Sequence, residues 1–479
     1  MLINGDRIES NRHIEVRNPA RPSEIVGTTA CGSVSDVSAA IAAAKAAQVS
    51  WSRLSFVERA LRLRDALDNF AVNIEQRAKL YARENGRVLS EALGELRSVP
   101  IIQKMTLDLA EELDEGRNMR APLGRTFVNY IPYGVVVSIV PWNAPVTLAF
   151  LQVIPALLAG NCVVVKPPET CPLTLIDAVV AIAEKLPPGV VNILAGRAAE
   201  IGDILTTHPD VAKIGFTGGI PSARRIMANA AQSIKGVTLE LGGNDPGIVL
   251  DDVDLGDATM QRIAHGAFSA TGQVCMAIKR VYVAEKIFPA FEKAFKSAVD
   301  RYVVGDGLKS GVTMGPMHTA HARDGALTYI HDSKKRGANV SVLGQIQDKT
   351  DFEHGYFVRP AIVTEIGDDA PVMVEEQFCP VLPVVTFKSI EEVVERANDS
   401  IFGLCASVWS RDTERALKIA RELQAGTIFV NAHGVASVNR RAPYGGIKQS
   451  GIGSKASVEG VMEYLQLQTI TTNENVATN

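Results

Sequence analysis

The sequence predicts an α/β protein with a doubly wound parallel sheet, a second α/β domain and a small β extension. Three observations support this prediction. Short apolar runs alternate with helical windows between residues 134 and 242, a second alternating set runs from residue 246 to about residue 430, and two segments outside both sets alternate like exposed strands. The chain of 479 residues is also too long for a single hydrophobic core.

The front of the chain is predicted to be helical. Residues 33–51 and 56–86 carry apolar side chains at helical spacing, and Gly86 fits a C-terminal stop. From residue 134, five apolar runs are too short for helices and predict strands: GVVVSIV, NCVVVKP, GVVNIL, VAKIGF and VTLELGG. Helical windows at 173–186 and 220–231 lie between them. This alternation predicts a parallel sheet of the nucleotide-binding type, although the GxGxxG fingerprint is absent from the strand ends.

The second domain is predicted to begin with a strand at 246–250 and a helix that opens near Asp254, capped by the acidic run DDVD. Residues 279–283 are rich in β-formers. The two exposed strands lie at 124–133 and 463–472. Because free strand edges invite pairing, we expect them to be covered, often by another subunit.

Composition and charge exclude several functional classes. The chain is 46% hydrophobic, its net charge is -4, and it has no basic run with interleaved aromatics, so we expect no nucleic-acid partner. It has no secretory segment and no apolar stretch long enough to span a bilayer, which predicts no membrane partner. Six scattered cysteines without a CxxC pair predict reduced thiols and a cytoplasmic location. His318 and His321 lack a third suitably spaced ligand, so we expect no metal.

Several residues are candidates for chemistry, and each also has a simpler structural interpretation. Cys275, in TGQVCMAIKRV, is either a nucleophile or a small core residue. Glu240 ends a predicted buried strand and is either a general base or a salt-bridged terminus. Asn143 either stabilises an oxyanion or caps a helix. Lys166 and Glu169 follow a strand's carboxyl end, where open parallel sheets bind ligands, or are simply solvated.

Seven motifs, in order and over nearly the whole chain, resemble those of the NAD(P)-dependent aldehyde dehydrogenase superfamily. They are PWNAP (141–145), KPPE (166–169), GFTGG (215–219), LELGGNDP (239–246), GQVC (272–275), EEQF (375–378) and PYGGIKQSGIG (443–453). Chance agreement over seven ordered motifs is negligible. The resemblance therefore implies an aldehyde-oxidising enzyme.

The resemblance also implies roles for the catalytic candidates. Cys275 attacks the aldehyde carbon to give a thiohemiacetal, whose oxyanion is stabilised by the Asn143 amide and the Cys275 backbone N–H. Hydride transfer to the nicotinamide leaves a thioester, and Glu240 activates the water that hydrolyses it. Two alternatives stay open. One is transfer of the acyl group to coenzyme A, which Glu240 disfavours, and the other is a non-catalytic binding or structural descendant of the fold.

The implied cofactor is NAD, with NADP possible. By resemblance, Lys166 and Glu169 hold the adenosine ribose, and Glu376 holds the ribose on the nicotinamide side. A carboxylate at Glu169 repels a 2'-phosphate, which favours NAD over NADP. The turn FTGG takes the place of GxGxxG. The implied cofactor-binding residues are Pro141, Trp142, Lys166, Glu169, Phe216, Thr217, Gly218, Gly219, Leu241, Glu376 and Phe378.

The implied substrate tunnel is largely apolar, which fits an aliphatic or aromatic aldehyde. Its implied lining residues are Leu148, Leu151, Val274 and Met276. Arg440 and Arg441 either bind the carboxylate of a semialdehyde or face solvent.

The resemblance further implies a domain division. It gives a Rossmann-like NAD-binding domain at 1–114 and 133–242, a catalytic domain at 243–443, and oligomerisation strands at 115–132 and 461–479 of a homodimer or homotetramer.

The sequence departs from the superfamily pattern at two places. Cys379 stands where glycine is usual, which predicts an altered turn beside Glu376 or a second thiol near the site. Ser454 and Lys455 stand where an Arg-Glu pair is common. We expect neither change to touch the nucleophile, the base or the oxyanion amide.

Overall fold

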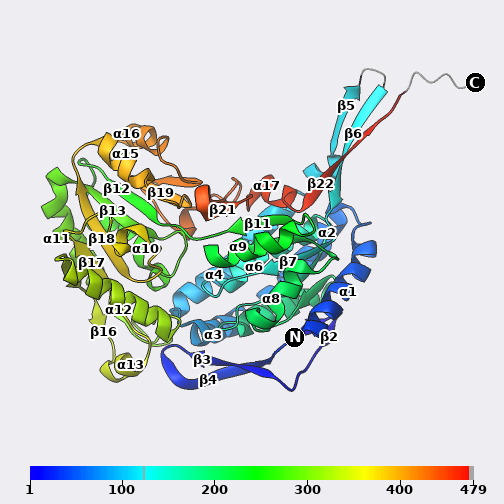
Figure 1. The fold of residues 1–479 in the computed structure, drawn as a ribbon, viewed down its shortest axis with the longest axis horizontal. Helices are drawn as coiled ribbons and strands as arrows, with labels where there is room; N and C mark the ends of the chain where they lie inside the picture. Colours follow the sequence, from blue (N-terminus) through cyan, green and yellow to red (C-terminus); the bar gives the residue numbers. More distant parts are fainter. Residues whose placement is uncertain (122–123, 474–479) are drawn as a thin grey trace, which may run out of the picture.

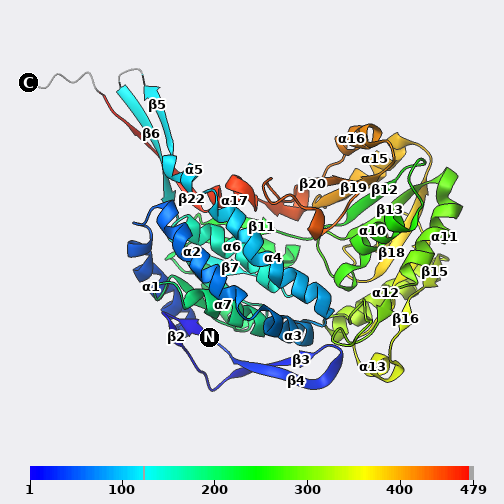
Figure 2. The same ribbon diagram turned by 180° about the vertical axis from the view of Figure 1, so that it is seen from behind.

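Two α/β lobes and a projecting β arm make up the protein, in a computed structural model that describes residues 1–121 and 124–473 (Figure 1). The first lobe is built on an eight-stranded sheet, the second on a seven-stranded sheet and the arm on a three-stranded sheet. Seen from behind, the N-terminus lies on the first lobe and the arm points away from both lobes (Figure 2). This architecture confirms the predicted fold class.

The sheet of the first lobe has the strand order β2-β1-β9-β8-β7-β10-β11-β21. The five strands from β9 to β11 are mutually parallel, whereas the outer pairings are antiparallel. Its strands are β1 (Leu2–Ile3), β2 (Asp6–Arg7), β7 (Val135–Ile139), β8 (Cys162–Lys166), β9 (Val191–Ile193), β10 (Val211–Thr217), β11 (Gly236–Glu240) and β21 (Gly451–Ile452). The five parallel strands are the five apolar runs predicted from the sequence. A separate ribbon is formed by β3 (His13–Asn18) and β4 (Arg21–Ala30).

Helices cover both faces of this sheet. Helices α1 and α8 pack on one face beside α9, while α6 and α7 pack on the other beneath α2, α3 and α4. The helices are α1 (Val34–Trp51), α2 (Phe56–Ala71), α3 (Ile74–Asn85), α4 (Leu89–Leu107), α5 (Ala110–Glu115), α6 (Pro145–Leu158), α7 (Leu173–Ala183), α8 (Ala198–Thr207) and α9 (Ile220–Ala231). Capping boxes at Ser33 and Ser55 start α1 and α2, and left-handed Gly86 ends α3 with φ of 91°.

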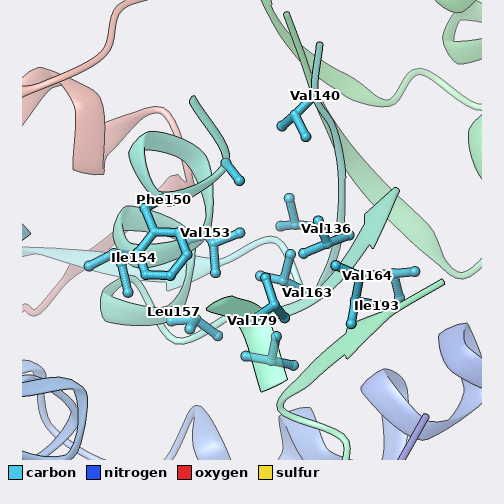
Figure 3. Packing of buried hydrophobic residues seen from close by; sticks show 14 of the residues in the cluster. Val136, Val140, Phe150, Val153, Ile154, Leu157, Val163, Val164, Val179 and Ile193 are labelled. Atoms are coloured by element: carbon cyan, nitrogen blue, oxygen red, sulfur yellow. The ribbon is translucent and has the colours of Figure 1, made fainter. Parts of the chain in front are cut away.

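The core of the first lobe explains why its strands are almost continuously apolar. Valines of β7 and β8 pack against Phe150, Val153 and Leu157 of α6, as Figure 3 shows. Because helices cover both faces, neither side of a central strand meets water. The sheet is therefore a rigid support for loops at its carboxyl edge.

The second lobe has the strand order β15-β17-β18-β13-β12-β19-β20, parallel except for β15. Separate hydrophobic clusters lie on its two faces. Its principal strands are β12 (Asp245–Val249), β13 (Ile278–Ala284), β15 (Asn339–Val342), β17 (Ala361–Thr364), β18 (Val381–Phe387), β19 (Cys405–Trp409) and β20 (Thr427–Val430), with β14 (Val303–Val304) and β16 (Gln345–Ile346) paired separately. Its helices are α10 (Asp257–Phe268), α11 (Phe288–Val299), α12 (Ala320–Lys335), α13 (Lys349–His354), α14 (Pro371–Val374), α15 (Ile390–Asn398) and α16 (Thr413–Ala420).

The predicted cap of the first helix in this lobe is wrong. Helix α10 begins at Asp257 after Gly256, and it has no side-chain cap. Asp254 accepts from the Gly256 N–H just before the helix, whereas Asp251 pairs with Arg415 of α16 and Asp252 accepts from the Ser410 hydroxyl. Asp251 and Asp252 therefore bind residues that are distant in sequence, and not the helix N-terminus that the local sequence predicted.

The arm joins two segments that are far apart in sequence. Strand β6 (Gly124–Pro132) lies between β5 (Arg117–Ala121) and β22 (Leu465–Thr471), which follows α17 (Ser457–Met462). Both predicted exposed strands are present and pair with each other. Residues 122–123 and 474–479, which belong to the expected oligomerisation strands, lie outside the described residues.

Candidate active site

One cavity of about 210 Å³ brings together most of the predicted site residues. It lies at the carboxyl end of the first-lobe sheet, where β10 ends at Thr217 and β11 ends at Glu240, and the second lobe closes it with Cys275 and Glu376. Its lining residues are Pro141, Trp142, Asn143, Thr217, Gly218, Gly219, Glu240, Leu241, Gly242, Cys275, Glu376 and Phe378. Gly242 was not predicted, and Lys166, Glu169 and Phe216 lie outside this lining.

The helix-capping interpretation of Asn143 is wrong. The cap of α6 is Ala144, and the Asn143 side-chain amide instead donates to the Gln273 carbonyl at 3.1 Å, two residues before Cys275. The Asn143 carbonyl accepts from the Tyr81 hydroxyl at 3.2 Å and from Arg87. The amide is thus held beside the nucleophile loop. Tyr81 and Arg87 were missed because they lie in the helical front of the chain, where no local pattern points to the site.

Cys275 is half-buried, whereas the other five cysteines are buried. The loop before it is strained, since Ala270 and Thr271 have φ of 48° and 61°, a region costly for residues other than glycine. Gly272, with φ of 72°, could not carry a Cβ, which would lie 2.5 Å from the Cys379 carbonyl oxygen. This backbone presents the Cys275 sulfur to the cavity.

The free protein holds Cys275 as a thiol. Burial raises the pKa of Cys275 to about 12, and the negative charge of Glu240 acts in the same direction. The Lys279 ammonium acts against this rise and donates to the carbonyls of Val274 and Cys275 at 2.9 and 2.5 Å. Lys279 was not predicted as a site residue. To act as a nucleophile, Cys275 would therefore have to release its proton when the sulfur attacks.

This raised pKa predicts how the free enzyme reacts with iodoacetamide. Because only the thiolate is alkylated, the rate at Cys275 should rise about tenfold per pH unit between about pH 7 and 10 without a plateau. Mass spectrometry of the Cys275 peptide measures this rate. A plateau below about pH 8 would mean that the thiol is already ionised in the resting site.

Glu240 is buried, and it makes a contact that was not predicted from the sequence. Its Oε2 lies 2.5 Å from Nζ of Lys455, and both side chains are 5% exposed. The expectation that the change at Lys455 leaves the base untouched is therefore wrong. The lysine lies 215 residues further along the chain, so only the fold reveals the pair. Ser454, by contrast, donates its backbone N–H to Glu463.

Glu376 and the aromatic residues Trp142 and Phe378 also line the cavity. The Gly243 N–H donates to Glu376 at 3.0 Å, and Lys279 lies 3.8 Å from the same carboxylate, whose pKa is raised by burial. Trp142 stacks on His318 at 4.3 Å between ring centroids. Burial lowers the pKa of His318 to about 4, so the ring is neutral at physiological pH. His318, considered in the sequence only as a metal ligand, is a support for Trp142, while His321 is exposed.

The predicted cofactor residues outside the cavity lie in the adjoining loops. Lys166 ends β8, donates to the Pro167 carbonyl at 3.1 Å and lies 3.9 Å from Glu169. Glu169 accepts from the Ala198 N–H at the start of α8. The ring of Phe216 lies under Gly218, whose added Cβ would come within 2.5 Å of it.

The site fits a dinucleotide. Helix α9 begins after Gly219 without any side-chain cap, and Gly218 and Gly219 line the cavity. The N–H groups of its first turn are therefore available to a pyrophosphate, which the positive end of a helix favours. Carboxylates at Glu169 and Glu376 suit ribose hydroxyls, which donate hydrogen bonds.

The predicted substrate residues divide into two groups. Val274 and Met276 belong, with Cys275, Val438 and Tyr444, to one apolar cluster of the second lobe. Leu148 is half-buried and Leu151 is buried on α6. None of the six predicted substrate residues is among those that line the cavity.

Arg440 and Arg441 also differ in their surroundings. Arg440 is half-buried, whereas Arg441 is exposed. Among the described residues, the Arg440 guanidinium has no hydrogen-bond or ion-pair partner. Burial lowers its pKa, and the Glu240 carboxylate acts in the opposite direction.

Cys379 is not a second thiol in the cavity. Its side chain is buried in a hydrophobic cluster of the second lobe, and burial raises its pKa to about 12. The preceding residue, Phe378, has φ of 48° and lines the cavity. The strained residue of this turn is thus Phe378.

Comparisons with known proteins agree with this geometry. The model of the aldehyde dehydrogenase family matches residues 7–470. The mitochondrial succinate-semialdehyde dehydrogenase of Arabidopsis thaliana is 36% identical over 474 residues, which cover 98% of this chain and 88% of the plant protein. A betaine aldehyde dehydrogenase of Staphylococcus aureus, solved with NAD⁺, is 33% identical with a TM-score of 0.93 and covers 99% of this chain and 94% of its own. An NADP-dependent enzyme of E. coli is 33% identical with a TM-score of 0.90, covering 98% and 97%.

The fold and the comparisons define an NAD(P)-dependent oxidoreductase. The chain belongs to the aldehyde dehydrogenase family. Among the described residues, no helix has the length and apolar character needed to cross a membrane.

Proposed function

We propose that the protein oxidises an aldehyde to a carboxylate through a thioester on Cys275 that Glu240 helps to hydrolyse. The observation that carries this proposal is the convergence of Cys275, Asn143 and Glu240 on one cavity from three distant parts of the chain. A thiol, an amide donor and a carboxylate are the groups that acyl chemistry of this kind requires.

Cys275, Asn143 and Glu240 would each have a separate role in the reaction. The Cys275 thiol gives up its proton and its sulfur bonds to the aldehyde carbon, while the Asn143 amide donates to the oxygen that becomes negative. A dinucleotide held by the residues of the cavity would supply the nicotinamide ring as hydride acceptor for the aldehyde carbon. Glu240 then takes a proton from water as the water oxygen attacks the thioester, and the thiolate leaves. Because Glu240 supplies this base, hydrolysis is favoured over transfer to coenzyme A, and a non-catalytic role is disfavoured.

We assign the cofactor as NAD in preference to NADP. Glu169 is a carboxylate next to Lys166, and its negative charge would oppose a 2'-phosphate. Residues 1–114 and 133–242 would carry the cofactor, and residues 243–443 would supply the nucleophile. An aldehyde panel with NAD and NADP in parallel tests both assignments through the absorbance of the reduced cofactor. A turnover that strictly requires coenzyme A would favour the acylating alternative.

We further propose an aldehyde that carries an anionic group, as a semialdehyde does. The apolar cluster around Val274, Met276 and Tyr444 would surround the body of the substrate. Arg440, which has no partner among the described residues, would pair with a carboxylate at the far end. The similarity to a plant succinate-semialdehyde dehydrogenase supports this class, although none of the predicted substrate residues is among those that line the cavity.

Replacing Arg440 tests the substrate class. We expect R440Q to lower kcat/KM for succinic semialdehyde by about 10- to 100-fold, since a charge-assisted hydrogen bond is lost, and to leave that for butanal nearly unchanged. Steady-state kinetics with the two aldehydes measures the difference. R441Q is the matched control, because Arg441 is exposed, and it should affect the two substrates alike. Equal losses on both substrates in R440Q would contradict carboxylate recognition.

We also propose that the arm joins copies of this chain into a dimer or tetramer in the cytoplasm. Met119, Leu467 and Ile470 are exposed on the arm at 51%, 57% and 45%, and the arm projects from its lobe (Figure 1). Light scattering of the purified protein measures the assembly. All six cysteines are free, which fits a reducing compartment. The plant relative is named as mitochondrial, and cell fractionation distinguishes the two locations.

A further inference from the structure

We propose that Lys455 is a positioning residue that keeps the Glu240 carboxylate ionised for hydrolysis of the thioester. This inference rests on the proposed role of Glu240 as the base. The sequence departs from the superfamily pattern at this position, and the structure places the substituted residue directly against the base.

The contacts of Lys455 enclose its ammonium among acceptors. Its Nζ lies 2.5 Å from Glu240 Oε2 and 2.8 Å from Thr217 Oγ1. Thr217 Oγ1 in turn accepts from the Gln152 amide at 3.0 Å, and Gln152 accepts from the Ser138 hydroxyl at 2.8 Å. Because the lysine and glutamate side chains are each 5% exposed, water screens their attraction little. The pair is therefore a strong local constraint on the charge of Glu240.

The backbone fixes the lysine at this place. The N–H of Tyr444 donates to the Lys455 carbonyl at 2.8 Å, and the N–H of Lys455 donates back at 2.6 Å. The two following residues, Ala456 and Ser457, have φ of 61° and 51°, and neither is glycine. Such conformations carry an energetic cost and persist only where the surrounding structure enforces them. The ammonium thus reaches Glu240 from a rigid loop.

Other charged and titratable groups act on Glu240 from several elements. They are Arg440 and Tyr444 of the loop before β21, Tyr464 before β22, and Cys275 of the nucleophile loop. Among the described residues, Lys455 is the cation in hydrogen-bond contact with Glu240. Lys279 instead faces Cys275 and Glu376. Loss of the positive charge at position 455 should therefore make protonation of Glu240 easier, so that hydrolysis fails at a higher pH.

The test separates acylation from hydrolysis with p-nitrophenyl acetate and needs no cofactor. The Cys275 thiol releases its proton to solvent, its sulfur attacks the ester carbonyl, the bond to the phenol oxygen breaks, and nitrophenolate leaves in a burst. Water then attacks the acetyl thioester, the carbon–sulfur bond breaks, and acetate leaves, while the proton taken by Glu240 returns to the sulfur. The burst reports acylation, and the slower steady phase reports hydrolysis between about pH 5 and 9.

We expect K455Q and K455M to keep the burst, and to move the acidic limb of the hydrolysis rate upward by about one pH unit or more. At the wild-type midpoint, this shift is a loss of roughly fivefold or more. K455R, which retains the charge, should restore the wild-type limb. K455M needs no hydrogen-bond partner in the buried site, and it decides the question if K455Q does not fold.

Lys213 provides a matched control. It is a buried lysine, 3% exposed, that lies 3.3 Å from Glu463 on the same lobe. K213M should leave the acidic limb in place. The proposal is overturned if the neutral variants keep the wild-type limb, or if K213M moves it equally. A burst that is absent from the wild type, or equal in C275A, would instead overturn the proposed function.

Discussion

C275A should lose at least about four orders of magnitude in aldehyde oxidation, since the reaction then has no sulfur to bond to the aldehyde carbon. The measurement is cofactor reduction at saturating aldehyde. Binding of NAD should persist, because the other residues that line the cavity are unchanged. Titration of protein fluorescence with NAD checks this point.

Cys405 offers the control for that result. It belongs to the same apolar cluster as Cys275 but is fully buried, and burial raises its pKa. C405A should retain activity within a few-fold, at some cost in stability from the small cavity left behind. Full activity in C275A, or an equal loss in C405A, would show that the sulfur at position 275 is not the nucleophile.

E240Q should separate the two halves of the reaction. A glutamine keeps the shape of the side chain and can still accept from Lys455, but it cannot take a proton from water. We expect hydrolysis of the thioester to slow by about 10²- to 10⁴-fold, the usual contribution of a general base. Stopped-flow absorbance should then show a burst of reduced cofactor followed by a slow steady rate.

The burst amplitude distinguishes this outcome from general damage. A burst close to one equivalent per site, with a slow second phase, places the defect after hydride loss. A small burst, with the usual ratio between the burst rate and the steady rate, would mean that E240Q disturbs Cys275. The pKa of Cys275 responds to the Glu240 charge. E463Q, at the partner of Lys213 outside the cavity, should leave both phases unchanged.

Local pattern was sufficient for much of the fold. The five strands of the first lobe are apolar runs too short for helices, and residues 33–51 and 220–231 carry clear helical spacing, so each was predicted close to its observed bounds. The window at 56–86 divides into α2 and α3, and Asp251 of the acidic run before α10 pairs with Arg415 of the distant helix α16. Such details depend on tertiary partners, which periodicity does not contain.

Prediction of the candidate site from the sequence was limited in the same way. The ordered motifs predicted Asn143, Glu240 and Cys275 as site residues, and the structure places all three in one cavity. Residues that act through buried contacts were missed. Lys279 reaches Cys275 from the following strand, Arg87 holds Asn143 from the N-terminal helices, and Lys455 reaches Glu240 from the C-terminal region. No spacing rule predicts such pairs, because residues that are far apart in the sequence come into contact only in the folded protein.

The proposed reaction depends on a covalent acyl group on Cys275, which is hydrolysed by water that Glu240 activates. The most direct measurement is the intact mass of E240Q mixed with aldehyde and NAD, followed by peptide mapping. We expect a mass increase of one acyl group, located on the peptide that contains Cys275. An acyl group on another residue, or rapid aldehyde oxidation by E240Q with no bound acyl group, would contradict it.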